Sequence, residues 1–163
     1  EKLRYVLRDL AAESGAFAYE YTGYLANIHS VETYYQANID MLDLHKFYSL
    51  FSPNQKIHTK VKNEEPTYYA PGCEVNTSQF ASGSIVEGKV VRSVVSRNVQ
   101  IHKDSLVKES IVFPRVVIGE GAQVEYAIID KGAEVADGVV IRGTAENPVV
   151  IKKGEKVTED ILS

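Results

Sequence analysis

The sequence is poor in the residues that cross-link small domains. Its only cysteine is Cys73, which excludes an internal disulfide framework and a cysteine-based zinc cluster. We expect this residue to have a packing role in a protein of a reducing compartment. No apolar run approaches the roughly 18 residues of a membrane helix, and the start, EKLRYVLRDL, lacks the apolar core of a signal peptide. These absences predict a cytoplasmic protein with no membrane partner.

The chain also lacks an excess of positive charge. Its formal net charge is −4, so we expect no nucleic acid as a partner, although a local basic patch could still attract a small anion. The proportions of 44% hydrophobic and 25% charged residues are those of a globular protein. Because the first residue is Glu1 and not methionine, we expect a fragment of a longer protein.

The first fifty residues show helical periodicity on either side of a short aromatic segment. Apolar residues at i, i+3, i+4 and i+7 predict a helix that ends near Ser14. Residues 16–21 are aromatic and precede Gly23, which predicts a strand. A second helix should begin at Ser30, whose hydroxyl can cap free N–H groups. The apolar faces consist of Leu3, Val6, Leu7 and Leu10 in the first helix, and Val31, Tyr34, Tyr35 and Leu42 in the second.

A repeat of seventeen residues dominates the second half of the chain. Residues 99–115, 116–132 and 133–149 align so that apolar residues form columns. The columns are Ile101, Ile118 and Val135; Val90, Val107, Val124 and Ile141; and Val94, Ile111 and Ile128. Anchors about five or six residues apart predict three short sides per coil, each pointing an apolar side chain inward. Stacked coils then bury a continuous core that no single coil could bury.

Glycines fall between these anchors, where corners need positive φ or little side-chain bulk. They are Gly83, Gly88, Gly119, Gly121, Gly132, Gly138 and Gly143. No GxxxxGK[ST] phosphate loop is present. The prediction is a mainly β protein with three parts: residues 1–50 as helix–strand–helix, residues 51–71 as a connector with a half-exposed strand at 56–62, and residues 72–163 as a parallel β-helix of hexapeptide type.

Segments spread along nearly the whole chain resemble the C-terminal part of ADP-glucose pyrophosphorylase, or glucose-1-phosphate adenylyltransferase. They are YEYTGYLANIHSVETYYQANIDML, IHTKVKNEEPTYY, SIVEGKVVRSVVSRNVQI, AIIDKGAEVADGVVI and NPVVIK. The resemblance implies a left-handed β-helix, preceded by the α/β end of a nucleotidyltransferase domain whose glycine-rich loop lies upstream. Such a fragment would hold no cofactor and would not form ADP-glucose alone.

One motif departs from the catalytic members of that family, whose GYWxDVGT-like motif has an aspartate that helps to hold magnesium. Here GYLANIHS has Leu25 in place of tryptophan and Asn27 in place of aspartate. An amide is a poorer ligand for Mg²⁺ than a carboxylate. The variant motif resembles the regulatory subunits of the family, the glycogen biosynthesis proteins of the D type. This implies a non-catalytic subunit that assembles with a catalytic, magnesium-holding subunit in an oligomer.

The resemblance also implies a site for a sugar-phosphate or phosphate effector. Lys131 in AIIDK and Lys152 in VVIK occupy positions where relatives place effector-binding lysines. A lysine is a strong point charge for phosphate, although each could equally be a solvated corner residue. Lying about one coil apart, the two would occupy matching corners of adjacent layers.

Two alternatives remain open from the sequence. One is a fragment of the catalytic subunit itself. The other is a hexapeptide acyltransferase, which would use a coil histidine as its general base, and His102 is the only histidine on a regular coil. The other three, His29, His45 and His58, are spaced too widely for a local metal pair.

Overall fold

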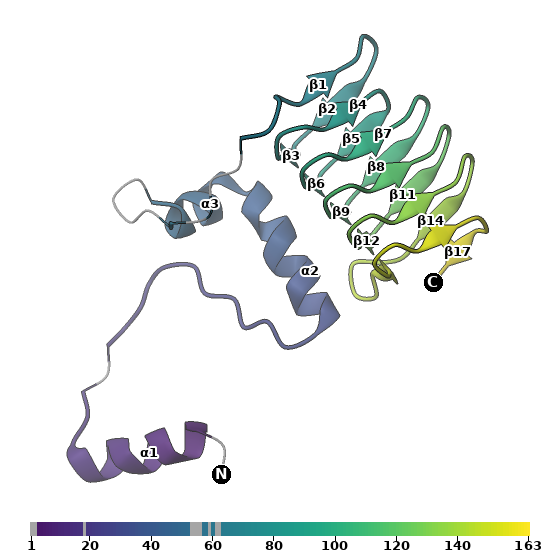
Figure 1. The fold of residues 1–163 in the computed structure, drawn as a ribbon. Helices are drawn as coiled ribbons and strands as arrows, with labels where there is room; N and C mark the ends of the chain where they lie inside the picture. Colours follow the sequence, from purple (N-terminus) through teal and green to yellow (C-terminus); the bar gives the residue numbers. More distant parts are fainter. Residues whose placement is uncertain (1–2, 18, 53–56, 59, 61–62) are drawn as a thin grey trace.

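The computed structural model describes residues 3–17, 19–52, 57–58, 60 and 63–163. Four helical elements come first: α1 (Leu3–Ser14), α2 (Val31–Ile39), the 3-10 helix η1 (Asp40–Leu42) and α3 (Leu44–Leu50). The described strands follow and wind into a solenoid whose three faces are parallel sheets (Figure 1). This confirms the predicted mainly β, parallel β-helix. The left-handed winding stays a prediction.

Successive turns contribute one short strand to each sheet, except that the last turn contributes no described strand to sheet C. Sheet A contains β1 (Tyr68–Tyr69), β4 (Ile85–Val86), β7 (Gln100–Ile101), β10 (Val117–Ile118), β13 (Glu134–Val135) and β16 (Lys156–Val157). Sheet B contains β2 (Glu74–Asn76), β5 (Lys89–Val91), β8 (Leu106–Lys108), β11 (Gln123–Glu125), β14 (Val140–Arg142) and β17 (Ile161–Leu162). Sheet C contains β3 (Gln79–Phe80), β6 (Val94–Val95), β9 (Ile111–Val112), β12 (Ala127–Ile129) and β15 (Val149–Ile151).

The register of the strands confirms the seventeen-residue repeat through the middle of the solenoid. Val107 pairs with Val124, and Val124 pairs with Ile141. Two turns nearer the ends of the solenoid differ in length, because Ile85 pairs with Gln100 after fifteen residues and Glu134 pairs with Lys156 after twenty-two. Two of the predicted columns point into the core: Ile101, Ile118 and Val135, and Val90, Val107, Val124 and Ile141.

The third predicted column is wrong in its direction. Ile111 and Ile128 point out of the solenoid and form a second apolar cluster with Tyr35 and Ile39 of α2. The inward positions of sheet C are the residues that follow them, among them Val112. Neighbouring residues of a strand face opposite sides of the sheet. Here α2 covers the outer side, so apolar residues occupy both positions and periodicity does not distinguish them.

The glycines at the corners either have positive φ or make room for the next turn, as the sequence predicts. Gly121 and Gly132 have φ of +67° and +69°, in the left-handed region that glycine enters without strain. Gly119 instead lies against the next turn, where an added Cβ would meet the backbone nitrogen of Asp137 at 2.6 Å. Both kinds of corner keep the turns stacked directly on one another.

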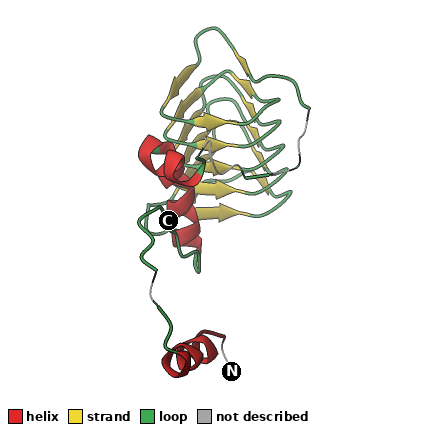
Figure 2. Ribbon diagram, turned by 90° about the vertical axis from the view of Figure 1, so that its left-hand side faces the viewer, coloured by secondary structure: helices red, strands yellow, loops and turns green. Residues whose placement is uncertain are grey.

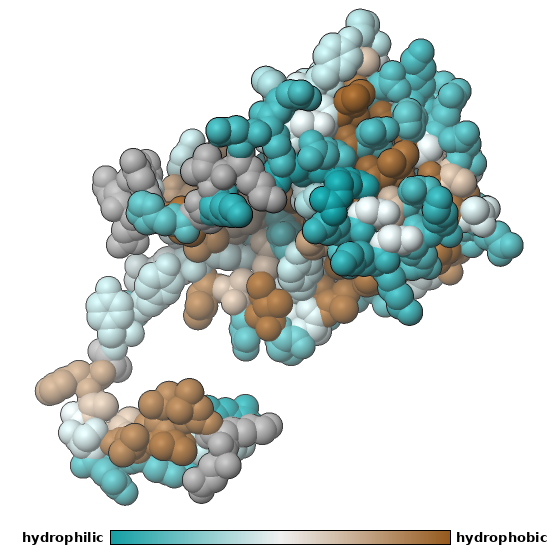
Figure 3. All heavy atoms as spheres, viewed as in Figure 1, coloured by the Kyte–Doolittle hydropathy of each residue, from teal (hydrophilic) through white to brown (hydrophobic). Residues whose placement is uncertain are grey.

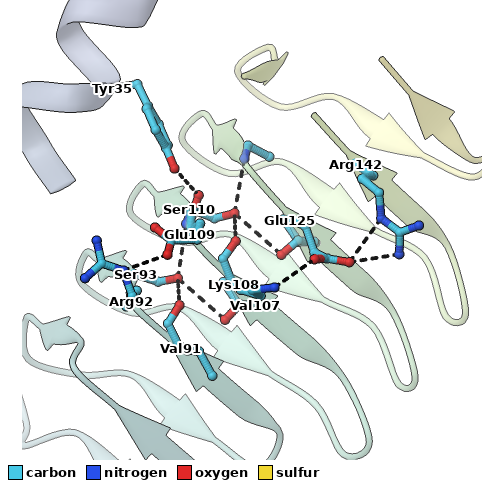
Figure 4. Close-up of polar contacts among 12 residues, drawn as sticks. Tyr35, Val91, Arg92, Ser93, Val107, Lys108, Glu109, Ser110, Glu125 and Arg142 are labelled. Atoms are coloured by element: carbon cyan, nitrogen blue, oxygen red, sulfur yellow. Dashed lines mark hydrogen bonds and ion pairs between the residues drawn. The ribbon is translucent and has the colours of Figure 1, made fainter. Parts of the chain in front are cut away.

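Two buried serines, Ser93 and Ser110, tie the corner between sheets B and C together from turn to turn, and a residue with positive φ directly precedes each of them. Ser110 donates its hydroxyl to the Lys108 carbonyl, 2.7 Å away, and accepts the Ala127 N–H at 3.1 Å (Figure 4). Ser93 repeats this arrangement one turn earlier, where it accepts the N–H of Ser110 at 3.1 Å. Acidic and basic side chains beside this corner form ion pairs between turns, such as Arg92–Glu109 at 2.6 Å.

The helical part matches the sequence only in places. α1 forms as predicted but has no buried residue, and it stands away from the solenoid in Figures 1 and 2. α2 begins after Ser30, the predicted cap, whose side chain accepts the Thr33 N–H. Residues 16–17 and 19–21 are not in a strand, which is a correction to the predicted element. A strand needs a neighbour for its backbone hydrogen bonds, and these described residues pair with none.

The predicted connector, residues 51–71, can be compared with the structure mainly at its C-terminal end. Most of the strand predicted at 56–62 lies outside the described residues. β1, at Tyr68–Tyr69, falls within the segment assigned to the connector and already pairs with β4 of the solenoid. The boundary at residue 72 stays a prediction, although the first turn takes up a strand that precedes it.

Candidate functional site

A groove of about 590 Å³ separates the loop before α2 from the outer side of sheet C. Ile28, His29, Ser30, Val31 and Tyr34 line one wall, and Phe113, Ile128, Asp130 and Val150 line the other. The walls are largely apolar, with a carboxylate at Asp130 and an imidazole at His29. A groove of this size and character can hold a small ligand or a short segment of chain.

The loop side of the groove is held to the first turn of α2. The Ser30 side chain accepts the Thr33 N–H at 3.1 Å, and the Thr33 hydroxyl accepts the N–H groups of both His29 and Ser30. This is a capping box, which satisfies N–H groups that a helix start leaves free. The imidazole Nδ1–H of His29 donates to the Asn27 carbonyl at 3.1 Å. The loop is therefore ordered by hydrogen bonds to the helix that it precedes.

Asn27, in the same loop, does not line the groove. It lines a smaller cavity of about 190 Å³, together with Tyr24 and Asp40. The Asp40 carboxylate accepts hydrogen bonds from the Tyr24 hydroxyl at 3.1 Å and from the Lys46 ammonium group at 2.7 Å. Burial by itself raises the pKa of Asp40, but hydrogen bonds, the strongest of them from Lys46, outweigh it and leave that pKa below its usual range.

The solenoid side carries the two lysines that the sequence singles out. β12 pairs with β15 so that Ile129 lies beside Ile151, which places Lys152 next to Asp130. The Lys131 carbonyl accepts the Gly154 N–H at 3.1 Å. Lys131 and Lys152 therefore lie at one corner on adjacent turns, as predicted, but one residue out of register. Lys131 is half-buried and Lys152 is exposed.

This lysine corner borders the groove without lining it. Asp130, which directly precedes Lys131, lines the groove, and so does Val150, two residues before Lys152. Neither lysine forms an ion pair with any residue that the structure describes. Two carboxylates also lie at this corner, because Asp130 accepts the Lys131 N–H at 2.6 Å and Glu155 accepts the Lys152 N–H at 2.8 Å. An anion bound at the two ammonium groups would gain charge-assisted hydrogen bonds.

Sequence reasoning did not anticipate how α2 is attached to the solenoid. The Tyr35 hydroxyl donates to the Glu109 carbonyl, 2.7 Å away, at the serine corner (Figure 4). Burial, followed by the nearby Glu109 carboxylate, raises the pKa of Tyr35, so its phenol stays protonated and remains a donor. The Tyr34 and Phe113 rings also stack, with centroids 6.5 Å apart. A tyrosine on a helical apolar face predicts burial, but it does not reveal its hydrogen-bond acceptor.

The histidines show no catalytic arrangement in the part of the chain that the structure describes. His102 lies on sheet A with its Nδ1 3.4 Å from a Glu87 carboxylate oxygen. Among the described residues, no group of three or more His, Cys, Asp or Glu side chains could hold a metal ion. His29 is the only histidine that lines the groove.

None of the helices in the described ranges has the length and apolar character needed to cross a membrane.

Comparisons with known proteins agree with this geometry. The family described as "GlmU-like, C-terminal hexapeptide" matches residues 61–160. The glycogen biosynthesis protein GlgD of Bacillus subtilis is 38% identical over 136 residues, which cover 83% of this chain and 40% of that protein. A glucose-1-phosphate adenylyltransferase of Corynebacterium jeikeium is 32% identical over 137 residues, 81% of this chain and 34% of that enzyme.

A glucose-1-phosphate adenylyltransferase of Bacillus mycoides is similar to the same extent, at 31% identity over 140 residues, 85% of this chain and 37% of that enzyme. The chain thus spans no more than two fifths of the length of these relatives. The matches confirm the resemblance that the sequence segments indicate. By its hexapeptide turns and by the match over residues 61–160, the chain belongs to the GlmU-like C-terminal hexapeptide family, and it is similar to GlgD and to glucose-1-phosphate adenylyltransferases.

Proposed function

We propose that this chain is the C-terminal part of a regulatory, non-catalytic subunit of ADP-glucose pyrophosphorylase, which joins ATP and glucose 1-phosphate into ADP-glucose and diphosphate for glycogen synthesis. The observation that carries the proposal is the similarity to GlgD over most of the chain. The replaced metal position, Asn27, supports the same assignment. Mg²⁺ prefers carboxylate ligands, and the Asn27 side chain offers only a neutral amide oxygen.

The activity of the full-length protein tests this assignment. Purified alone, with Mg²⁺, ATP and glucose 1-phosphate, it should form no appreciable ADP-glucose. Mixed with a catalytic adenylyltransferase subunit from the same organism, it should elute with that subunit as a larger species and change its response to effectors. Magnesium-dependent turnover by the protein alone would favour the catalytic-subunit alternative and overturn the assignment.

The effector site of this subunit is proposed to lie at the lysine corner formed by Lys131 and Lys152. The two residues lie on adjacent turns, which are about 4.8 Å apart in stacked parallel strands. A phosphate held by both ammonium groups gains charge-assisted hydrogen bonds from each of them. A sugar phosphate would place its phosphate at the lysines and its sugar toward the groove.

Titration of the assembled complex with effector tests the site. Lys131→Ala and Lys152→Ala should each weaken the response to effector and leave turnover without effector near the wild-type value. Lys103→Ala is the matched control, because Lys103 is an exposed lysine at a different corner of the solenoid. If the two variants respond as the control does, the lysines are solvated corner residues and the site is elsewhere.

The helical residues before the solenoid are proposed to complete the nucleotidyltransferase domain that the resemblance places upstream. The apolar face of α1 supports this, since Leu3 and Leu7 are 72% and 56% exposed in this chain (Figure 3). An amphipathic helix ordinarily buries such a face. Residues 1–50 should therefore gain protection from amide exchange in the full-length protein relative to this chain.

A further inference from the structure

Charged side chains on the outer side of sheet B are paired with one another across turns. Glu125 contacts Lys108 of the preceding turn at 3.5 Å and Arg142 of the following turn at 2.8 Å (Figure 4). Nearer the start of the solenoid, Lys89 contacts Glu74 at 2.6 Å. On this side of the solenoid, opposite charges are therefore balanced within the chain.

The charges at the two ends of the sheet A strands are arranged differently. Each of the last three strands of this sheet follows a basic residue and precedes an acidic one. These pairs are Arg115 and Glu120 around β10, Lys131 and Asp137 around β13, and Lys153 and Glu159 around β16. None of the six side chains forms an ion pair with a residue that the structure describes. Lys131 is half-buried and the other five residues are exposed.

Backbone hydrogen bonds between turns align these residues along two corners of the solenoid. At one corner, the Gly154 N–H donates to the Lys131 carbonyl at 3.1 Å. At the other, the Gly138 N–H donates to the Glu120 carbonyl at 2.8 Å. The result is a basic ridge (Arg115, Lys131 and Lys153) along one side of sheet A and an acidic ridge (Glu120, Asp137 and Glu159) along the other.

The surface between the two ridges is the outer side of sheet A. Ile85, which is 44% exposed, and the half-buried Val117 lie in one outward-facing column of this sheet. Further along the column, Glu134 and Lys156 form an ion pair at 2.9 Å. A hollow of about 210 Å³ lies beside Val117 and is also lined by Gly119, which has no side chain. The surface between the ridges can therefore be approached closely.

We propose that two copies of this chain associate through their sheets A, with the basic ridge of each copy against the acidic ridge of the other. Most symmetric dimers have a two-fold axis, which makes the same surface face itself. If the two solenoids ran antiparallel, each ridge would face the same ridge of the other copy, and like charges would oppose each other. With the solenoids parallel, each basic ridge faces an acidic ridge at the same turns.

The parallel arrangement forms two symmetric sets of contacts. Arg115 lies opposite Glu120 of the other copy, and Lys131 lies opposite Asp137. Asp130 and Glu155 are also at the basic corner, but they leave it with more basic than acidic residues, whereas the acidic corner has no lysine or arginine in these three turns. The charge complementarity therefore selects one orientation of the dimer.

The size of the surface indicates a weak dimer. The six strands of sheet A extend over about 24 Å along the solenoid, at about 4.8 Å per turn. An interface of this size lies at the low end of those that form specific complexes. Exposed ion pairs add little stability each and are screened by salt. The association should therefore depend strongly on protein concentration and on ionic strength.

Sedimentation equilibrium of this chain at increasing ionic strength tests the association. We expect a monomer–dimer equilibrium at about 0.05 M NaCl that shifts to monomer at about 0.5 M NaCl. A monomer under all conditions, or a trimer, would overturn the proposal. A dimer that persists at high salt would also overturn it, since association through the exposed apolar face of α1 would not be weakened by salt.

Exchanging charges between the ridges tests the contacts themselves. Arg115→Glu and Glu120→Arg each place like charges opposite each other at both sets of contacts, so each variant alone should dimerise at least about tenfold more weakly than the wild type. An equimolar mixture of the two variants restores opposite charges at both sets and should form a heterodimer. The double variant Arg115→Glu/Glu120→Arg should regain the homodimer for the same reason.

Glu146→Arg is the matched control, because Glu146 is exposed in the segment between β14 and β15, away from both ridges. It should dimerise as the wild type does. Circular dichroism should show that all variants are folded, since the replaced side chains are exposed. If either single variant dimerises like the control, or if mixing them restores nothing, the contact between the ridges is overturned. These variants leave Lys131 and Lys152 unchanged, so the result does not depend on the proposed phosphate site.

Discussion

The solenoid and helix α1 both have regularly spaced apolar residues, but these residues are buried in the solenoid and exposed in α1. Val124 and Ile141 are fully buried between adjacent turns, whereas Leu3 and Leu10 of α1 are 72% and 53% exposed. Each turn of the solenoid packs against the next turn, which is another copy of the same repeat. The apolar face of a helix has to be covered by a different element, which these described residues do not provide.

Helix α2 is an intermediate case. Its apolar face is covered, but by the outer side of the solenoid and not by another helix. The comparison shows that a repeat brings its own packing partner, while a single amphipathic element depends on whatever surface the rest of the chain presents. Mutations in the three places should therefore differ in a predictable order.

The largest effect is expected in the solenoid core. Val124→Asp places a charge where the side chain is fully buried and no partner exists, so it should cost about 4 kcal/mol or unfold the chain. Gln123→Asp, one residue earlier on the exposed side of β11, is the matched control and should be mild. Thermal unfolding followed by circular dichroism measures both. Equal melting temperatures would contradict the seventeen-residue register.

The second-largest loss of stability is expected where α2 packs on the solenoid. Ile111→Ala removes a side chain that is 3% exposed and should cost about 2–3 kcal/mol, because the cavity lies between two fixed elements. Urea unfolding gives the free energy, and amide exchange should rise in α2 first. Ile85→Ala on sheet A, where the side chain is 44% exposed, should cost less than about 1 kcal/mol. An equal loss at both positions would show that α2 adds nothing to stability.

A smaller effect is expected at the serine corner. Ser110→Ala leaves the buried Ala127 N–H without its acceptor at 3.1 Å, which should cost about 1–2 kcal/mol in the free energy of unfolding. Ser14→Ala at the end of α1 removes a comparable hydroxyl, bonded to the Leu10 carbonyl at 2.7 Å. Because Ser14 is exposed to water, its loss should be close to zero. Similar losses for the two serines would contradict the role of the serine corner.

The smallest effect is expected in α1. Leu7 is 56% exposed, so Leu7→Ser should change the free energy of unfolding by no more than about 0.5 kcal/mol in this chain. Urea unfolding measures it. A loss above about 1 kcal/mol would show that α1 is packed in solution and would remove the contrast with the solenoid.

The repeat predicts the turns, their stacking and the corners from periodicity alone, because a seventeen-residue period of valine and isoleucine has no other arrangement that buries it. It does not predict which side of sheet C faces inward. Ile111 and Val112 are both apolar and both buried, one by α2 and one by the core. A pattern that alternates polar and apolar residues would have shown the direction, but a strand that is covered on both faces has no such pattern.

The candidate site also has one part that the sequence predicts and one part that it does not. Lys131 and Lys152 could be placed on adjacent turns from their positions in the repeat. The groove beside them could not, because its walls come from the loop at Ile28 and from Asp130 and Val150, segments that are far apart in the sequence.

What the sequence by itself determined is therefore the solenoid, since each turn carries the information for its contact with the next. What only the tertiary structure decided is how the helical part uses that surface: α2 packs on sheet C, its Tyr35 hydroxyl donates to the Glu109 carbonyl, and residues 16–17 and 19–21 form no strand. These outcomes depend on which partner surface is within reach, because a single helix gains most of its stability from the surface on which it packs and does not encode that surface.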